Sequence, residues 1–143
     1  MKIPDLNLLI YAVDRDATEH ASALRWWNST LSGTETVGLV WAVLLGFVRL
    51  TTNVRVVRSP LPPETALDYV DRWIAHPTTT VVEPTGRHAL VLRDLLGQTG
   101  TAGNLVADAH LAALAIEHGA DLCSADRDFG RFAGLRWVNP LAG

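Results

Sequence analysis

The sequence is poor in several features whose absence narrows the classes of protein it can be. It has one cysteine, Cys123, among 143 residues, which excludes an internal disulfide and a cysteine-rich zinc site. No stretch reaches the roughly 18 consecutive apolar residues that a membrane-spanning helix needs. The opening MKIPDLNLL lacks the order of basic, apolar and small residues that is typical of a signal peptide. We therefore expect a cytoplasmic protein without a membrane segment.

Lysine is almost absent, because only Lys2 of the 12 basic residues is a lysine. This excludes a Walker-type phosphate loop, which needs a lysine after its glycines, and a receiver domain, which needs a lysine after a late strand. The glycines of GQTGTAG, residues 97–103, follow no predicted strand, so a dinucleotide-binding loop is excluded as well. Haloacid-dehalogenase-type phosphatases carry D-x-D after the first strand. This chain has Asp5-Leu6-Asn7 there and so lacks the second aspartate of that motif.

Acidic residues are missing between Glu35 and Glu64, an interval that contains several arginines. The net charge of −3 argues against a general nucleic-acid binder, but a guanidinium group matches the geometry of phosphate. Two interpretations stay open: a site for a phosphate backbone, and exposed arginines that reflect codon bias. The candidate phosphate contacts are Arg49, Arg55, Arg58 and Arg127.

The remaining composition is that of a folded globule. Hydrophobic residues make up 48% of the chain and charged residues 19%, and we treat residues 1–143 as a single domain. Short β-like runs alternate with helical periods, which predicts an α/β fold around a largely parallel sheet. The predicted strands are 2–4, 36–38, 78–83, 122–124 and 135–138. The predicted helices are 6–13, 18–31, 40–50, 62–76, 86–97 and 104–118, with a helical turn at 126–132.

Four aspartates follow predicted strands or lie early in a predicted helix. Asp5 follows the first strand, Asp126 and Asp128 follow a late strand, and Asp108 lies one turn after Asn104 in the preceding helix. Each has an ordinary explanation, since Asp is a good helix N-cap and is favoured near a helix N-terminus. In parallel sheets, however, ligands bind beyond the carboxyl ends of the strands. Together these aspartates predict a cation site.

The type of ligand indicates the type of ion. Carboxylate oxygens suit Mg²⁺ or Mn²⁺, whereas zinc is disfavoured because no His-x₃-His or Cys-x₂-Cys spacing accompanies the acids. We expect Asn7 to form hydrogen bonds within the cluster. For Ser124, a role in the cluster and a purely structural role at the strand end both stay open.

Several segments together resemble one protein family. PDLNLLIYA, LLGFVRLTTN, GNLVADAHLAALAIEHGADLCSADRDF and LRWVNPL are similar, in order and spacing, to the PIN-domain ribonucleases of the VapC type. These are the toxins of type II VapBC toxin–antitoxin pairs. The resemblance implies a PIN-like three-layer α/β/α fold and metal-dependent hydrolysis of structured RNA, often transfer RNA. It also implies a VapB-type antitoxin as partner, a homodimer and a toxin–antitoxin hetero-oligomer.

The resemblance also assigns roles to the acids. Asp5 corresponds to the first family acid, Asp108 to the later helical acid and Asp126 to the strand-end acid, so these three are the expected catalytic residues. The expected ligands of Mg²⁺ or Mn²⁺ are these three and Asp128, which sits where many members carry a further acid. The bound metal would lower the pKa of a water molecule and stabilise charge on phosphate oxygens.

One position departs from the family pattern. Many members carry a glutamate on the third helix, where this chain offers Val43 and Leu44. Glu35 lies earlier in the chain and is not assigned that role. The loss leaves three alternatives: weaker metal binding, an active site with fewer ligands, and a PIN-like protein that binds RNA or an antitoxin with weak or no catalysis.

Overall fold

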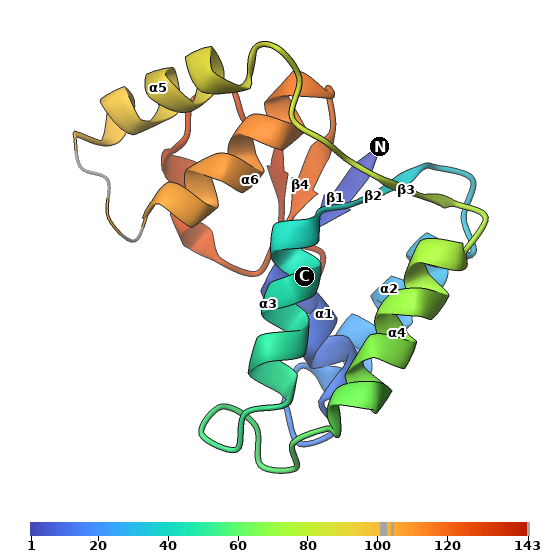
Figure 1. Ribbon diagram of the computed structural model, residues 1–143. Helices are drawn as coiled ribbons and strands as arrows, with labels where there is room; N and C mark the ends of the chain where they lie inside the picture. The colour runs from blue at the N-terminus through green and yellow to red at the C-terminus, as the bar shows by residue number, and fades with distance from the viewer. Residues whose placement is uncertain (101–102, 104, 143) are drawn as a thin grey trace.

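The protein is described here by a computed structural model that defines residues 1–100, 103 and 105–142. Five short parallel strands form one sheet in the order β3-β2-β1-β4-β5 (Figure 1). The strands are β1 (Lys2–Pro4), β2 (Val37–Leu39), β3 (Thr79–Val81), β4 (Asp121–Cys123) and β5 (Trp137–Val138). The helices are α1 (Leu6–Val13), α2 (His20–Leu31), α3 (Trp41–Thr51), α4 (Pro63–Ala75), α5 (His88–Thr99), α6 (Leu105–Glu117) and the 3₁₀ helix η1 (Arg127–Arg131). The predicted α/β/α architecture around a parallel sheet is confirmed.

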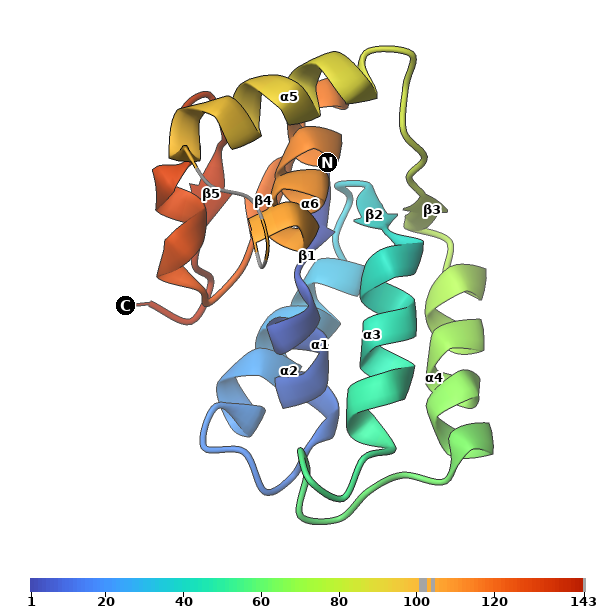
Figure 2. The ribbon, with the colours of Figure 1, turned by 60° about the vertical axis from the view of Figure 1, so that its left-hand side comes forward.

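The helices form two groups. Helices α1 to α4 lie together at one end of the molecule, and α5 packs along α6 at the other, as the two views agree (Figures 1 and 2). Aromatic side chains link the first group: the rings of Phe47 and Trp73 are 4.8 Å apart, and Trp27 meets Trp73 edge-on at 5.7 Å. All three side chains are buried, so α2, α3 and α4 share one apolar core.

The boundaries of the elements agree closely with the sequence pattern. Strand β1 and helix α1 are as predicted, and the boundaries of the other elements shift by at most two residues. The shift matters at β4, which ends at Cys123, so that Ser124 follows the strand instead of closing it. The predicted helix cap Asn104 lies outside the described residues. Within the described residues, no helix is long and apolar enough to cross a membrane.

The central strand β1 leads directly into α1. Its last residue, Pro4, is in register with Cys123 of β4, and α1 starts two residues later with Asp5 as its N-cap. Helix α3 approaches α1 closely at Gly46, where a Cβ atom would lie 2.9 Å from the Leu6 side chain. The start of α1 is therefore enclosed by β4 on one side and α3 on the other.

Candidate active site

The parallel pairing of β1 and β4 brings Asp5 and Ser124 together. Pro4 and Cys123 are paired residues, and the Asp5 amide donates a hydrogen bond to the Cys123 carbonyl at 2.8 Å. The residues that follow both strands therefore lie beside each other, although they are separated by 119 positions in the sequence. This is the carboxyl edge of the sheet, where the sequence predicted the acids to meet.

Ser124 connects the polar side chains at this edge. Its hydroxyl donates to Asp5 Oδ2 at 2.6 Å and accepts a hydrogen bond from the Asp126 amide at 3.0 Å. Asn7 Nδ2 donates to the Ser124 hydroxyl oxygen at 3.4 Å. Ser124 is completely buried, so its three partners hold one rotamer in place. The structure thus places Ser124 and Asn7 within the acidic cluster.

Asp5 is held in one orientation by two donors. Its Oδ1 accepts the amide of Leu6, the first residue of α1, at 2.7 Å, and its Oδ2 accepts the Ser124 hydroxyl. Burial raises the pKa of Asp5; these hydrogen bonds oppose the rise, and the charge of Asp126 adds to it. The carboxylate is therefore fixed and only partly compensated for its loss of hydration.

Asp108 faces this cluster from the first turn of α6. The pKa of Asp108 is raised to about 6, first by burial and then by the nearby charges of Asp5, Asp126 and Asp128, with Arg131 opposing the rise. The four predicted acids thus interact electrostatically, although they come from three separate segments of the chain. Because all four carry negative charge when ionised, they repel one another.

The two aspartates after β4 have different partners. Asp126 is the N-cap of η1, and its Oδ1 accepts the Asp128 amide at 2.9 Å. Asp128 Oδ1 forms an ion pair with Arg131 Nη2 at 3.1 Å. Sequence reasoning missed Arg131. Its spacing of three residues from Asp128 on a helical turn is the signal that could have identified it.

The candidate phosphate-binding arginines lie in different places. Arg49 is exposed in the last turn of α3, and Arg55 and Arg58 are exposed in the loop that follows. Figure 1 shows α3 running away from the sheet, so this loop lies at the far end of an 11-residue helix, a span of about 16 Å. Arg127 is exposed at the start of η1, next to Asp126. The structure therefore brings Arg127 near the acids but not the other three.

The position of the missing glutamate is part of the core. Val43 is 6% exposed and Leu44 is fully buried, so both side chains pack within the helical group. Glu35 lies elsewhere, in an ion pair with the N-terminal amine at 3.0 Å. Neither apolar residue offers an oxygen ligand at this side of the cluster.

The donor set can be compared with the needs of a metal ion. As the side chains stand, no three His, Cys, Asp or Glu residues in the described part of the chain are arranged to hold one. By chemistry the set fits a hard divalent cation, because it consists of carboxylate oxygens with spare lone pairs. By charge it fits too: burial and, after it, repulsion from the other aspartates raise the pKa of Asp108, and a cation would relieve that repulsion. Ligation would require the carboxylates to rotate toward one point.

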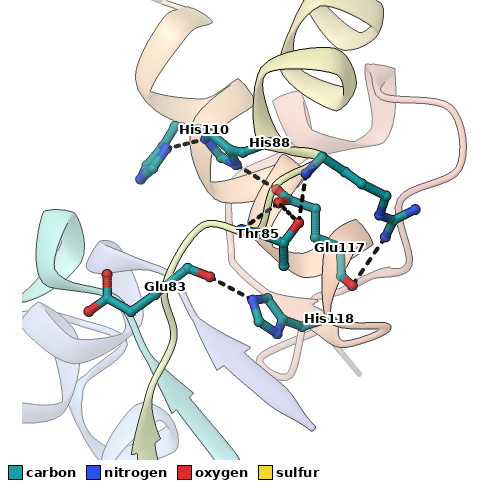
Figure 3. A network of polar contacts seen from close by, with 7 residues as sticks. Glu83, Thr85, His88, His110, Glu117 and His118 are labelled. Atoms are coloured by element: carbon teal, nitrogen blue, oxygen red, sulfur yellow. Dashed lines mark hydrogen bonds and ion pairs between the residues drawn. The ribbon is translucent and has the colours of Figure 1, made fainter.

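A second polar network lies at the other end of α6 (Figure 3). Glu117 accepts hydrogen bonds from the amide and the hydroxyl of Thr85, at 3.0 and 2.6 Å, and its Oε2 lies 2.5 Å from His88 Nδ1. His88 Nε2 in turn lies 2.9 Å from His110 Nδ1. The Glu117 side chain is fully buried. The sequence analysis did not predict this network, which joins α6 to the start of α5.

Comparison with known proteins agrees with this architecture. The family model of the PIN domain matches residues 2–135. Ribonuclease VapC37 of Mycobacterium tuberculosis is 51% identical over 142 residues, which cover 99% of both chains. The chain belongs to the PIN-domain family, among the VapC ribonucleases. Ribonuclease VapC33 of the same species is 42% identical over 99% of both chains.

Solved structures share the fold at lower identity. The toxin VapC20 of Mycobacterium tuberculosis, described as cleaving the sarcin-ricin loop, has a TM-score of 0.69 and 18% identity, covering 95% of this chain and 99% of its own. VapBC2 of Rickettsia felis, bound to a promoter DNA fragment, has a TM-score of 0.69 and 20% identity, over 96% of this chain and 97% of that one. These likenesses establish that the VapC fold is present in this chain.

Proposed function

We propose that the protein is a metal-dependent endoribonuclease, the toxin of a type II toxin–antitoxin pair. The observation that carries the proposal is the meeting of Asp5, Asp108 and Asp126 at the carboxyl edge of the sheet, in a chain 51% identical to a protein named a ribonuclease. The reaction would be hydrolysis of phosphodiester bonds in structured RNA, such as transfer RNA, and its consequence would be inhibition of translation.

Asp5, Asp108, Asp126 and Asp128 would hold Mg²⁺ or Mn²⁺. When bound, such an ion activates water and neutralises charge on phosphate oxygens. The chain's own contribution is to position the carboxylates. Ser124 fixes Asp5 through a 2.6 Å hydrogen bond and also anchors the Asp126 amide, so two of the acids share one buried support.

The third acid differs from the other two. No hydrogen bond holds the Asp108 side chain among the described residues, and its pKa is raised to about 6 by burial and then by the other acids. A cation at the cluster would lower that pKa and keep Asp108 ionised. We therefore propose Asp108 as the acid whose charge depends most on the metal.

The partners follow from the same relationship. We propose a VapB-type antitoxin as the cognate partner, with assembly into a homodimer and a toxin–antitoxin hetero-oligomer in the cytoplasm. Support comes from the structural neighbours, which include VapBC complexes of Rickettsia felis and Haemophilus influenzae. Candidate contacts to the RNA backbone remain Arg49, Arg55, Arg58 and Arg127.

A second candidate function is binding of RNA or antitoxin with weak or no catalysis. It is favoured by Val43 and Leu44, which are buried where many relatives carry a glutamate. One experiment separates the two functions. The purified chain, free of antitoxin, is incubated with a total small-RNA pool in Mg²⁺, in Mn²⁺ and in chelator.

The variants Asp5→Asn and Asp108→Asn are tested alongside, with Asp71→Asn as a control because Asp71 is an exposed acid on α4. Catalysis predicts discrete cuts that need the metal, vanish in the first two variants and persist in the control. Absence of cuts, together with tight binding of RNA or antitoxin, would establish the binding function and refute the enzymatic one.

A further inference from the structure

Arg131 is held at the edge of the acidic cluster by two contacts with one residue. Its Nε donates to the Asp128 carbonyl at 3.0 Å, and its Nη2 pairs with Asp128 Oδ1 at 3.1 Å. Both side chains remain accessible, with exposed fractions of 39% for Arg131 and 59% for Asp128. These two contacts are on one edge of the planar guanidinium, so they orient the group and leave the rest of it accessible.

The guanidinium lies close enough to affect the acids. Its Nη2 lies 3.1 Å from Asp128 Oδ1, and the amide of Asp128 donates in turn to Asp126 Oδ1 at 2.9 Å. Arg127, the arginine adjacent in sequence to Asp126, has no hydrogen bond or ion pair in the described part of the chain. A fixed positive charge therefore borders the cluster at Arg131.

The chemistry of such a group matches a phosphate. A guanidinium has five N–H donors, and the two contacts with Asp128 use two of them, so about three are left for another acceptor. An RNA backbone that approaches four carboxylates meets repulsion, which an adjacent arginine would offset. A planar fork suits the paired oxygens of a phosphate better than an ammonium group does.

We propose that Arg131, positioned by Asp128, binds a backbone phosphate of the RNA substrate next to the acidic cluster. This inference rests on the proposed ribonuclease function and specifies which residue orients the substrate there. It gives Asp128 a task as a positioning residue through Arg131, beyond its expected part in binding a metal.

The test compares Arg131→Gln, Arg131→Lys and Asp128→Asn with Arg93→Gln, a control that removes one exposed arginine from α5. Steady-state cleavage of an RNA oligonucleotide gives kcat and KM. We expect Arg131→Gln to raise KM about tenfold with a small change in kcat, and Arg131→Lys to restore part of the loss. Asp128→Asn should raise KM for the RNA by about threefold when it is measured at saturating metal, where a change in metal affinity does not enter the rate. The control should match the wild type.

Binding of the oligonucleotide by fluorescence anisotropy, in an Asp108→Asn background, provides a readout that does not need cleavage. Loss of Arg131 should lower the slope of log affinity against log salt concentration by about one. An unchanged KM and salt slope in a folded Arg131→Gln protein would overturn the inference, with melting temperature as the check on folding. So would an Asp128→Asn variant that needs more metal but keeps its KM for RNA. A wild-type protein that binds RNA without cutting it would refute the proposed ribonuclease function. The salt dependence of RNA affinity would then decide by itself whether Arg131 binds a phosphate.

Discussion

The buried carboxylate of Glu117 allows a stability prediction with a defined magnitude. Its side chain is fully buried and accepts three hydrogen bonds, two from Thr85 and one from His88. Figure 3 shows His88 between Glu117 and His110, so the carboxylate is the end point of a chain of polar contacts. Because Thr85 precedes α5 and Glu117 ends α6, the network holds the connection after β3 against α6.

Truncation of Glu117 to alanine would leave those three donors without their acceptor. A net hydrogen bond to a charged group is worth roughly 1.5–3 kcal/mol, and a buried donor left without its acceptor costs about 1–3 kcal/mol. Because Thr85 and His88 both lose their acceptor, we expect Glu117→Ala to lower the free energy of unfolding by about 3–5 kcal/mol. Glu117→Gln keeps an acceptor for Thr85 but presents an amide to His88, so its cost should be about 1–2 kcal/mol.

Urea unfolding at neutral pH, followed by circular dichroism, measures both costs. Glu83→Ala is the control, since Glu83 is exposed and its carbonyl, not its carboxylate, accepts the hydrogen bond from His118. If Glu117→Ala were no more costly than this control, the network would contribute nothing to stability and the reasoning would be refuted.

The pH dependence provides an independent check on Glu117. Burial alone would raise the pKa of Glu117, but hydrogen bonds from Thr85 and His88 outweigh it and lower that pKa below its ordinary value of 4.5. The stabilisation is therefore complete above pH 4.5 and is lost as the pH falls through the lower folded value. The difference between the wild type and Glu117→Gln should shrink in that acidic range and stay constant above it.

Three further predictions concern the cluster and the core. In metal-free protein, Asp108→Asn should raise the free energy of unfolding at neutral pH, because a carboxyl whose pKa rises from 3.8 to about 6 destabilises the fold once ionised. The shift alone corresponds to about 3 kcal/mol, which solvent screening at this partly exposed side chain reduces to about 1–2 kcal/mol. In urea titrations the gain should vanish as the pH falls from about 6 to 3.8. Ser124→Ala should lower the free energy of unfolding by about 1–3 kcal/mol in the same assay, because Asp5 Oδ2 and the Asp126 amide lose their hydrogen-bond partner. A cost below that of an exposed Ser→Ala change would contradict this prediction. Gly38→Ala should lower the melting temperature, because the added Cβ would lie 2.6 Å from a Val82 methyl group. Gly97→Ala should raise it, because Gly97 lies in α5 and an added Cβ would meet nothing within 4 Å. Equal shifts for the two variants would refute the packing argument.

The layered fold could be predicted because local signals agree along the chain. Periodicity gave α1 its observed limits, and Pro63 and Gly119 mark the beginning of α4 and the turn after α6. The order of strands in the sheet was not predictable from periodicity, since it depends on which strands pair across distant segments. The pairing of β1 with β4 is such a contact, and it is what creates the site.

The acidic site was predictable in outline but not in its connections. Strand-end aspartates follow from the rule for parallel sheets, so the approach of Asp5 to the segment after β4 could be anticipated. The role of Ser124 as the shared support could not, because it depends on a one-residue shift at the end of β4 and on a rotamer fixed by burial. The pairing of Arg131 with Asp128 likewise depends on η1 being a tight 3₁₀ turn.

The buried pair Val43 and Leu44 gives the strongest constraint on how the site works. Helix α3 approaches α1 so closely at Gly46 that a methyl group there would meet Leu6, the residue after Asp5. A glutamate at position 44 would place a carboxylate in fully buried surroundings, where loss of hydration favours its neutral form. In this chain α3 therefore supports the site by apolar packing behind Asp5. The positive charge that balances the aspartates is then supplied from outside that helix, by the arginines of η1 or by a bound cation.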